Sequence, residues 1–135
     1  MAALDKWCRR TGLLVVEGGH YFEDGVWSSI DGLVRMNTIL EPTAVVECKF
    51  RFGKIDDIEN TPRWHRYMRQ AKGYCKVTGT KQVWMVFMGV TTRPPSAVTG
   101  IKVVDFTEQE IEENWTSIVH TRKYLDGLIE MREQA

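Results

Sequence analysis

Several features are scarce in this sequence, and each scarcity removes a class of protein. Only three cysteines occur among the 135 residues, at positions 8, 48 and 75, and no two of them form a Cys-x-x-Cys pair. That spacing excludes a zinc ribbon, an iron–sulfur cluster held by this chain alone and a disulfide-stapled secreted scaffold. No apolar run is long enough to span a bilayer, and the N-terminus lacks the pattern of a signal peptide. We therefore expect a reduced, cytoplasmic protein without membrane segments.

Acidic residues are missing from one long stretch. Between Thr61 and Val104 the chain has eight Lys or Arg residues and no Asp or Glu. The net charge of zero conceals this asymmetry, because residues 1–102 carry 15 basic and 10 acidic residues, and residues 103–135 carry 3 basic and 8 acidic ones. A zero total alone speaks against nucleic-acid binding. The basic middle of the chain nevertheless favours nucleic-acid binding. The alternative is that these residues form an ordinary solvated helix face.

What is present suffices for one hydrophobic core. Hydrophobic residues make up 43% of the chain and charged residues 27%, which is typical of a globular domain and not of a disordered or fibrous chain. We expect a single domain over residues 1–135, with its core at about 13–106 and an additional C-terminal helix at about 107–132.

Turn signals and hydrophobic periodicity divide this domain into helices and strands. Helices are predicted at 2–11, 62–77 and 107–132, and strands at 13–16, 27–36, 44–50, 81–90 and 101–106. Gly18-Gly19 is expected to break the first strand, and Glu23-Asp24-Gly25 to form a hairpin turn. Residues 51–60 and 91–100 are expected to be loops. This order predicts an α/β fold with a mixed central sheet flanked by helices.

Charged side chains interrupt two of the apolar strands. Asp31 lies between Ile30 and Gly32, and Glu47 and Lys49 stand two residues apart, so both point to one face of their strand. Burying two carboxylates and an ammonium is costly without compensation, and a divalent cation would provide it. Mg²⁺ prefers such oxygen ligands, and the backbone carbonyl of Cys48 is a third candidate. The simpler alternative is a salt bridge on a sheet face.

These residues resemble the PD-(D/E)xK nuclease superfamily. The similarity is strongest to its RecB-like branch, in which an Asp-bearing strand precedes a hydrophobic strand ending in D/E-x-K. That branch also has a Q-x-x-x-Y motif on the following helix, and this chain has Gln70-Ala71-Lys72-Gly73-Tyr74 there. Gln70 and Tyr74 are four residues apart and share one helix face. The resemblance covers about residues 13–106.

The resemblance implies a role for each motif residue. Asp31 and Glu47 would be metal ligands, Lys49 would position the attacking water, and Gln70 and Tyr74 would support substrate placement. It further implies Mg²⁺ or Mn²⁺ as cofactor and a restriction-endonuclease-like core. Members of the branch often add an upstream histidine ligand, for which His20 is the local candidate, with an ordinary hairpin residue as the alternative.

Basic residues surround this motif set. Four of them recur at three- and four-residue steps on the predicted helix 62–77 and suggest a stripe that holds phosphates without reading sequence. Three more flank the site and extend the patch. The candidate nucleic-acid-binding residues are Arg51, Lys54, Arg63, Arg66, Arg69, Lys72 and Lys76.

The C-terminal helix has its own apolar stripe. Its apolar residues recur at roughly helical spacing: Ile111, Trp115, Ile118, Val119, Leu125 and Leu128/Ile129. We expect this stripe to pack against the sheet, with an interface between copies of the chain as the alternative.

The sequence thus predicts a metal-dependent DNA nuclease that hydrolyses phosphodiester bonds through an activated water, with an exonuclease favoured by the Gln-x-x-x-Tyr motif. The alternatives are a non-catalytic nucleic-acid-binding module and a structure-specific endonuclease similar to junction resolvases. DNA is the expected partner, and a homo-oligomer, a helicase or another protein partner are further candidates. A small chain of this type would suit a virus or a mobile element.

Overall fold

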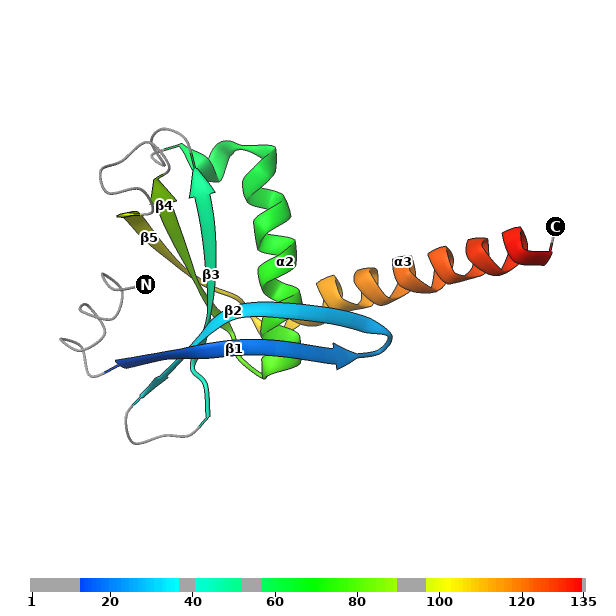
Figure 1. Cartoon of the computed structure of the whole chain (residues 1–135), viewed down its shortest axis with the longest axis horizontal. Helices are drawn as coiled ribbons and strands as arrows, with labels where there is room; N and C mark the ends of the chain where they lie inside the picture. Colours follow the sequence, from blue (N-terminus) through cyan, green and yellow to red (C-terminus); the bar gives the residue numbers. More distant parts are fainter. Residues whose placement is uncertain (1–12, 37–40, 52–56, 90–96, 135) are drawn as a thin grey trace.

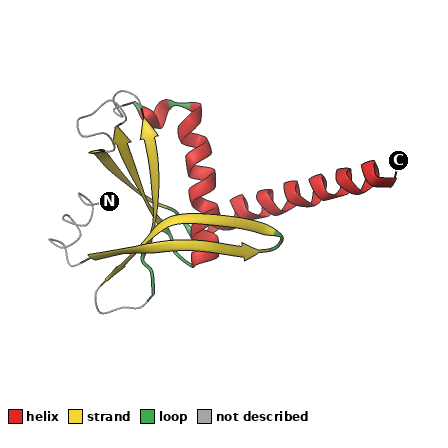
Figure 2. Cartoon of the chain, in the orientation of Figure 1, coloured by secondary structure: helices red, strands yellow, loops and turns green. Residues whose placement is uncertain are grey.

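The structure, a computed structural model, describes residues 13–36, 41–51, 57–89 and 97–134. The predicted helix at 2–11 lies outside these residues. The described elements follow one another along the chain as drawn in Figures 1 and 2. They are β1 (Leu13–Glu23), β2 (Val26–Met36), β3 (Ala44–Arg51), the short 3₁₀ helix η1 (Ile58–Asn60), α2 (Pro62–Thr78), β4 (Gln82–Gly89), β5 (Ala97–Asp105) and α3 (Glu108–Gln134).

The five strands form one mixed sheet, as predicted. Their order in the sheet is β1-β2-β3-β4-β5; β3 and β4 are parallel and the other neighbours antiparallel. Strands β2 and β3 pair only over residues 32–34 and 44–46, whereas β1 and β2 stay paired to the end of their hairpin. From Gly32 towards its turn, the β1–β2 hairpin therefore diverges from β3, and a fork opens between the hairpin and β3.

Two predicted loops contain regular structure. The segment 51–60 includes η1, and β5 begins at Ala97, inside the predicted loop 91–100. Strand β5 begins as early as Ala97 because it pairs with β4. Ala97 lies opposite Gly89, past a β-bulge in the pairing of the two strands. A polar, proline-containing sequence gave no local sign of this pairing.

The β1–β2 hairpin confirms the predicted turn and corrects the predicted break. Asp24 and Gly25 have φ angles of 51° and 78°, so both turn residues are left-handed, as a tight hairpin with this twist requires. The break at Gly18-Gly19 is wrong, since β1 continues through both glycines. A Cβ at position 18 would lie 2.1 Å from the carbonyl oxygen of Ile30, so Gly18 permits the close approach of β2.

Replacing Gly18 by alanine is therefore expected to destabilise the protein by about 3 kcal/mol, since rigid backbone must move to admit the methyl group. Gly127→Ala in α3 is the matched control. Its added Cβ meets nothing within 4 Å, and alanine favours helix, so we expect stabilisation by about 0.5–1 kcal/mol. Urea unfolding of both variants measures the difference. Equal stability of Gly18→Ala and the parent would contradict the close approach.

Helix α2 agrees with the predicted helix 62–77 to within one residue, and both of its ends are capped. Thr61 accepts a hydrogen bond from the Trp64 backbone N–H (3.3 Å), Pro62 occupies the first turn, and Gly79 ends the helix with φ 72°. Its Trp64 and Met68 pack with sheet residues such as Val45 in one buried cluster. A second cluster, which includes Val46 and Trp84, buries the opposite sheet face. Burial of both faces accounts for the nearly continuous apolar sequence of β3 and β4.

The C-terminal helix corrects the predicted packing against the sheet. Helix α3 begins beside α2 and then projects away from the sheet (Figure 1). Thr107 caps it by accepting a hydrogen bond from the Glu110 backbone N–H (3.1 Å). Only Ile111 and Trp115 of the stripe are buried, while Leu125 and Leu128 are exposed.

Periodicity shows that a helix has an apolar face but does not show what covers that face. Helix α3 has 27 residues and is about 40 Å long, so it extends beyond the neighbouring elements. An interface between copies of the chain stays a prediction. Among the described residues, no helix is both long and apolar enough to cross a membrane.

Candidate active site

Strand β3 presents the two charged residues of its motif toward α2. Alternation along the strand places Glu47 and Lys49 on the face of Val45, which belongs to the cluster under α2. Cys48 points the other way and packs against the second cluster. The Glu-Cys-Lys tripeptide thus separates a charged pair on one face from a thiol on the other.

Asp31 lies at the fork where β2 leaves β3. Its Oδ2 accepts a hydrogen bond of 2.8 Å from the backbone N–H of Cys48, which places the carboxylate beside β3. Continuing the β2–β3 register by one residue from the pair Gly32–Val46 places Asp31 opposite Glu47. The two strand motifs therefore meet at one point, although Asp31 and Glu47 are 16 positions apart in the sequence.

The Lys49 ammonium links β3 to the Gln-x-x-x-Tyr motif of α2. Lys49 Nζ lies 3.2 Å from Glu47 Oε1 and donates a hydrogen bond of 2.8 Å to Gln70 Oε1. Gln70 Nε2 in turn donates to the Tyr74 hydroxyl oxygen at 2.7 Å. The structure thus brings Glu47, Lys49, Gln70 and Tyr74 into one hydrogen-bonded chain. These bonds connect the strand motif to the helix motif.

Tyr67 is a site residue that sequence reasoning missed as a partner of Lys49. The Lys49 Nζ lies 4.7 Å from the centre of the Tyr67 ring, within the range of a cation–π contact. The signal was available in the spacing. Residues 67, 70 and 74 follow the i, i+3, i+7 pattern and occupy one face of α2. Tyr67 and Gln70 together hold the ammonium in place.

Glu47 is the most perturbed group in this cluster. Its residue is 6% exposed, and burial raises the pKa of its carboxyl to about 7, with Lys49 opposing the shift and Asp31 adding to it. Burial and the charge of Glu47 also raise the pKa of Tyr74 to about 12. The Cys48 thiol pKa is likewise raised, by burial and then by Asp31. Negative charge is therefore concentrated at the fork.

One oxygen of Glu47 indicates what could offset that charge. Its Oε2 is buried and has no hydrogen-bond partner, which is costly for a carboxylate. A divalent cation between Glu47 and Asp31 would satisfy this oxygen, and Mg²⁺ commonly uses one or two carboxylates in sites that also bind phosphate. The residues present thus fit such an ion.

The other predicted ligands are less closely tied to this pair. In the described part of the chain, no group of three His, Cys, Asp or Glu side chains is arranged to hold a metal. His20 is exposed on β1, and its Nδ1 lies 2.8 Å from Ser29 Oγ. Ligation by His20 and by the Cys48 carbonyl therefore stays a prediction.

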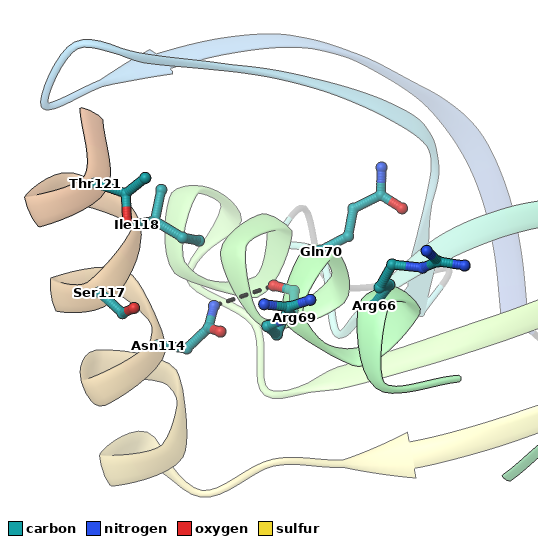
Figure 3. Close-up of a pocket in the computed structure, with 7 residues that line it drawn as sticks. All are labelled: Arg66, Arg69, Gln70, Asn114, Ser117, Ile118 and Thr121. Atoms are coloured by element: carbon teal, nitrogen blue, oxygen red, sulfur yellow. Dashed lines mark hydrogen bonds between the residues drawn. The ribbon is translucent and has the colours of Figure 1, made fainter. Parts of the chain in front are cut away.

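A pocket adjoins the site between α2 and α3. Its volume is about 400 Å³, and Arg66, Arg69 and Gln70 line one side of it (Figure 3). Asn114 and Ser117 of α3 line the other side, where Asn114 Nδ2 donates to the Arg69 carbonyl at 3.0 Å. The residues that line this pocket thus include two cations, an amide and a hydroxyl.

The predicted basic stripe is divided rather than continuous. Lys76 forms an ion pair of 2.7 Å with Glu112 of α3, and Lys72 lies over the Phe106 ring at 5.6 Å. Arg63 is exposed at the start of α2. Arg51 ends β3, but its side chain, like all of Lys54, lies outside the described residues. Arg66 and Arg69 are thus the two predicted cations that line the pocket.

Comparison with known proteins identifies the fold. The chain matches a crystal structure of an alkaline exonuclease (LHK-Exo) from Laribacter hongkongensis with a TM-score of 0.72, covering 98% of this chain and 68% of that one. The chain has the fold of an alkaline exonuclease. The same enzyme in complex with dAMP matches with a TM-score of 0.66, covering 98% and 67%.

The sequence of the chain is 21% identical to that of this exonuclease in both structures. No protein-family model matches the chain, and no curated protein does so either. The likeness is therefore structural, and it confirms the predicted α/β class with a mixed sheet and flanking helices.

Proposed function

We propose that this protein is a metal-dependent DNA nuclease of the PD-(D/E)xK type. One observation carries the proposal: the buried Glu47 Oε2 has no partner and lies next to an ammonium that Gln70 and Tyr67 hold in place. The ion pair with Lys49 uses Oε1 and leaves Oε2 without a partner, which a bound cation would supply. The fold shared with an alkaline exonuclease supports the same reaction class.

Each residue of the cluster has a task in phosphodiester hydrolysis. Asp31 and Glu47 would hold Mg²⁺ or Mn²⁺, which would polarise the phosphate and lower the pKa of an attacking water. Lys49 donates a hydrogen bond to that water and stabilises the charge that develops on the phosphoryl oxygens. Gln70 accepts from Lys49 and keeps the ammonium directed at the phosphate, and Tyr74 fixes the Gln70 amide.

The substrate proposed is DNA, attacked from an end. The similar exonuclease has been crystallised with dAMP, a deoxynucleotide, which favours DNA over RNA. Arg66 and Arg69 would hold a phosphate of the bound strand in the pocket beside Gln70. The bound DNA strand would then extend in one direction, from the carboxylates towards the two arginines.

A cleavage assay tests the proposal. End-labelled linear, circular and single-stranded DNA are incubated with Mg²⁺, Mn²⁺ or EDTA. We expect linear DNA to be degraded with either metal and left intact in EDTA. Cleavage of circles would identify an endonuclease instead. DNA binding with no product under any condition would overturn the nuclease and support a non-catalytic binding module.

Loss of the pocket arginines is expected to weaken DNA binding in a salt-dependent way. Each phosphate contact contributes about −0.9 to the slope of log K against log salt concentration on duplex DNA. The double variant Arg66→Gln/Arg69→Gln should reduce that slope by roughly one to two and weaken binding uniformly across sequences. Titrations at several salt concentrations measure it.

The control removes the same charge elsewhere. Lys81 follows the far end of α2, and Arg122 pairs with Asp126 on α3. Lys81→Gln/Arg122→Gln should leave the slope close to that of the parent. An equal loss in both double variants would mean that general charge, and not the pocket, attracts DNA.

A further inference from the structure

Two large aromatic side chains near the tip of the β1–β2 hairpin are exposed. Phe22 is 60% and Trp27 71% exposed, although both are large apolar residues. They face each other across the hairpin, with ring centres 4.6 Å apart and a tilt of 40°. The catalytic cluster does not use them. Such a pair is a ready surface for another flat, apolar group.

This aromatic pair shares a face of the hairpin with Asp31. Along β2, Trp27, Ser29 and Asp31 are exposed, while Ser28 and Ile30 between them are buried. Period-two alternation therefore places the three exposed residues on one face. Across the hairpin, His20 bonds to Ser29 on that same face. A path lined by small or polar side chains thus leads from the aromatic pair to the candidate carboxylate.

The length of this path suits a polynucleotide. Asp31 follows Trp27 by four positions along the extended strand, which corresponds to roughly 13 Å. Stacked bases rise about 3.4 Å each along one strand, so the path accommodates about four nucleotides. A strand cleaved at the carboxylates would reach the aromatic pair with a base a few positions away.

The hairpin holds the pair at a defined place. The Trp115 indole Nε1 of α3 donates a hydrogen bond of 2.8 Å to Asp24 Oδ2 in the turn. Tyr21, which precedes Phe22, packs against the core cluster that includes residues of α2. The tip is thus anchored to both helices, so the two rings are presented with little loss of freedom on binding.

Charge near the tip favours the face of a base over a phosphate or an acidic partner. No Lys or Arg occurs between Thr11 and Val34, and Glu23 and Asp24 form the end of the hairpin. Stacking on an aromatic ring needs no cation, and every base has a face that can stack. The cations near Asp24 are Lys76 and Lys123, which belong to the two helices. The hairpin itself therefore offers rings and carboxylates and no cation to a phosphate, which would be held at Arg66 and Arg69.

We propose that the Phe22–Trp27 pair is a stacking site for an unpaired nucleobase of the strand that enters the active site. This inference rests on the proposed function and adds a second, uncharged contact to it. The site binds bases without regard to sequence and helps keep the end of the substrate strand unpaired near Asp31.

The test pairs a protein change with a DNA change. Binding of a single-stranded oligonucleotide of about 12 nucleotides is measured by fluorescence anisotropy in EDTA. Trp27→Leu should weaken binding roughly 5- to 150-fold, and Trp27→Tyr should retain most of it. An oligonucleotide with abasic positions should bind the parent more weakly by a similar factor, with little further loss in Trp27→Leu. Tyr124→Leu, which removes a ring that is 63% exposed on α3, is the control.

Each outcome separates this inference from the proposed function. The loss caused by Trp27→Leu should persist at high salt, unlike the loss at the arginines. If the parent cleaves DNA and Trp27→Leu binds abasic and intact strands like the parent, the stacking site is wrong and the nuclease stands. A change in oligomeric state on sedimentation of Trp27→Leu, with DNA affinity unchanged, would also overturn it in favour of a contact between copies. Absence of any DNA binding or cleavage by the parent would refute the proposed function itself.

Discussion

Replacing Lys49 by methionine is expected to slow DNA cleavage by roughly 10²- to 10⁴-fold while DNA is still bound. Lys49 Nζ is the one cation hydrogen-bonded into the Glu47–Gln70–Tyr74 cluster among the described residues. Its ammonium acts on the attacking water and the developing phosphoryl charge, interactions that strengthen in the transition state. Binding depends chiefly on other groups, so rate and affinity should separate.

The measurement is single-turnover cleavage of end-labelled linear DNA, with affinity measured in parallel in EDTA. Lys102→Met is the matched control. Lys102 also lies on a strand and pairs with a carboxylate, Glu59, at 2.8 Å, with a side-chain exposure of 26% against 19% for Lys49. The control should cleave at the parental rate. Parental cleavage by Lys49→Met would eliminate the proposed mechanism.

Replacing Glu47 by glutamine is expected to change stability and activity in opposite directions. Glutamine keeps the shape of the side chain but carries no charge, so the cost of a buried carboxylate disappears. At pH 8 without metal, where a group of pKa about 7 is ionised, Glu47→Gln should be more stable than the parent by roughly 3 kcal/mol. Cleavage should fall below detection because a metal ligand is lost.

The pH dependence of parental stability has a definite sign. The carboxyl of Glu47 has a pKa of about 7 in the folded state and an ordinary value of 4.5, so the folded protein binds the additional proton. Its favourable contribution is complete below pH 4.5 and is lost as the pH rises to about 7. Without metal, stability should therefore decline over this window, and the decline should vanish in Glu47→Gln.

Divalent cations should reverse this decline. Mg²⁺ or Mn²⁺ should raise the Tm of the parent at alkaline pH and leave Glu47→Gln unchanged. Below pH 7 a proton competes for Glu47, so metal affinity should fall about tenfold per pH unit. Glu112→Gln, an exposed carboxylate of α3, serves as control and should keep the parental metal response.

Thermal scans with and without metal over a range of pH measure all three effects. If Glu47→Gln were less stable than the parent at pH 8, Glu47 would be a structural partner of Lys49 and not a strained ligand. If metal raised the Tm of Glu47→Gln as much as that of the parent, the ion would bind elsewhere.

Local rules were sufficient for much of the candidate site. Glu47 and Lys49 share a face because strands alternate, and Gln70 and Tyr74 share a face because helices repeat every 3.6 residues. The caps at Thr61 and Thr107 and the turn at Asp24-Gly25 are also short-range features, and the structure has all of them. Each depends only on residues within a few positions of one another.

Long-range packing decided the remainder. The role of Gly18 depends on β2, which lies against it, and the ion pair of 2.7 Å between Lys76 and Glu112 depends on α3. Nothing in the period of α3 indicates that its second half leaves the protein surface. In these cases, a residue's environment is made by segments distant in the sequence.

The sequence by itself determined which residues carry chemistry and which face of its own element each one occupies. The tertiary structure alone decided which faces meet. It opened the fork between β2 and β3 at Asp31, connected Lys49 to Gln70, and placed the Phe22–Trp27 pair on the face of Asp31. The reason is physical: alternation and helical period are set by backbone geometry within an element, whereas contacts between elements depend on the packing of the entire core.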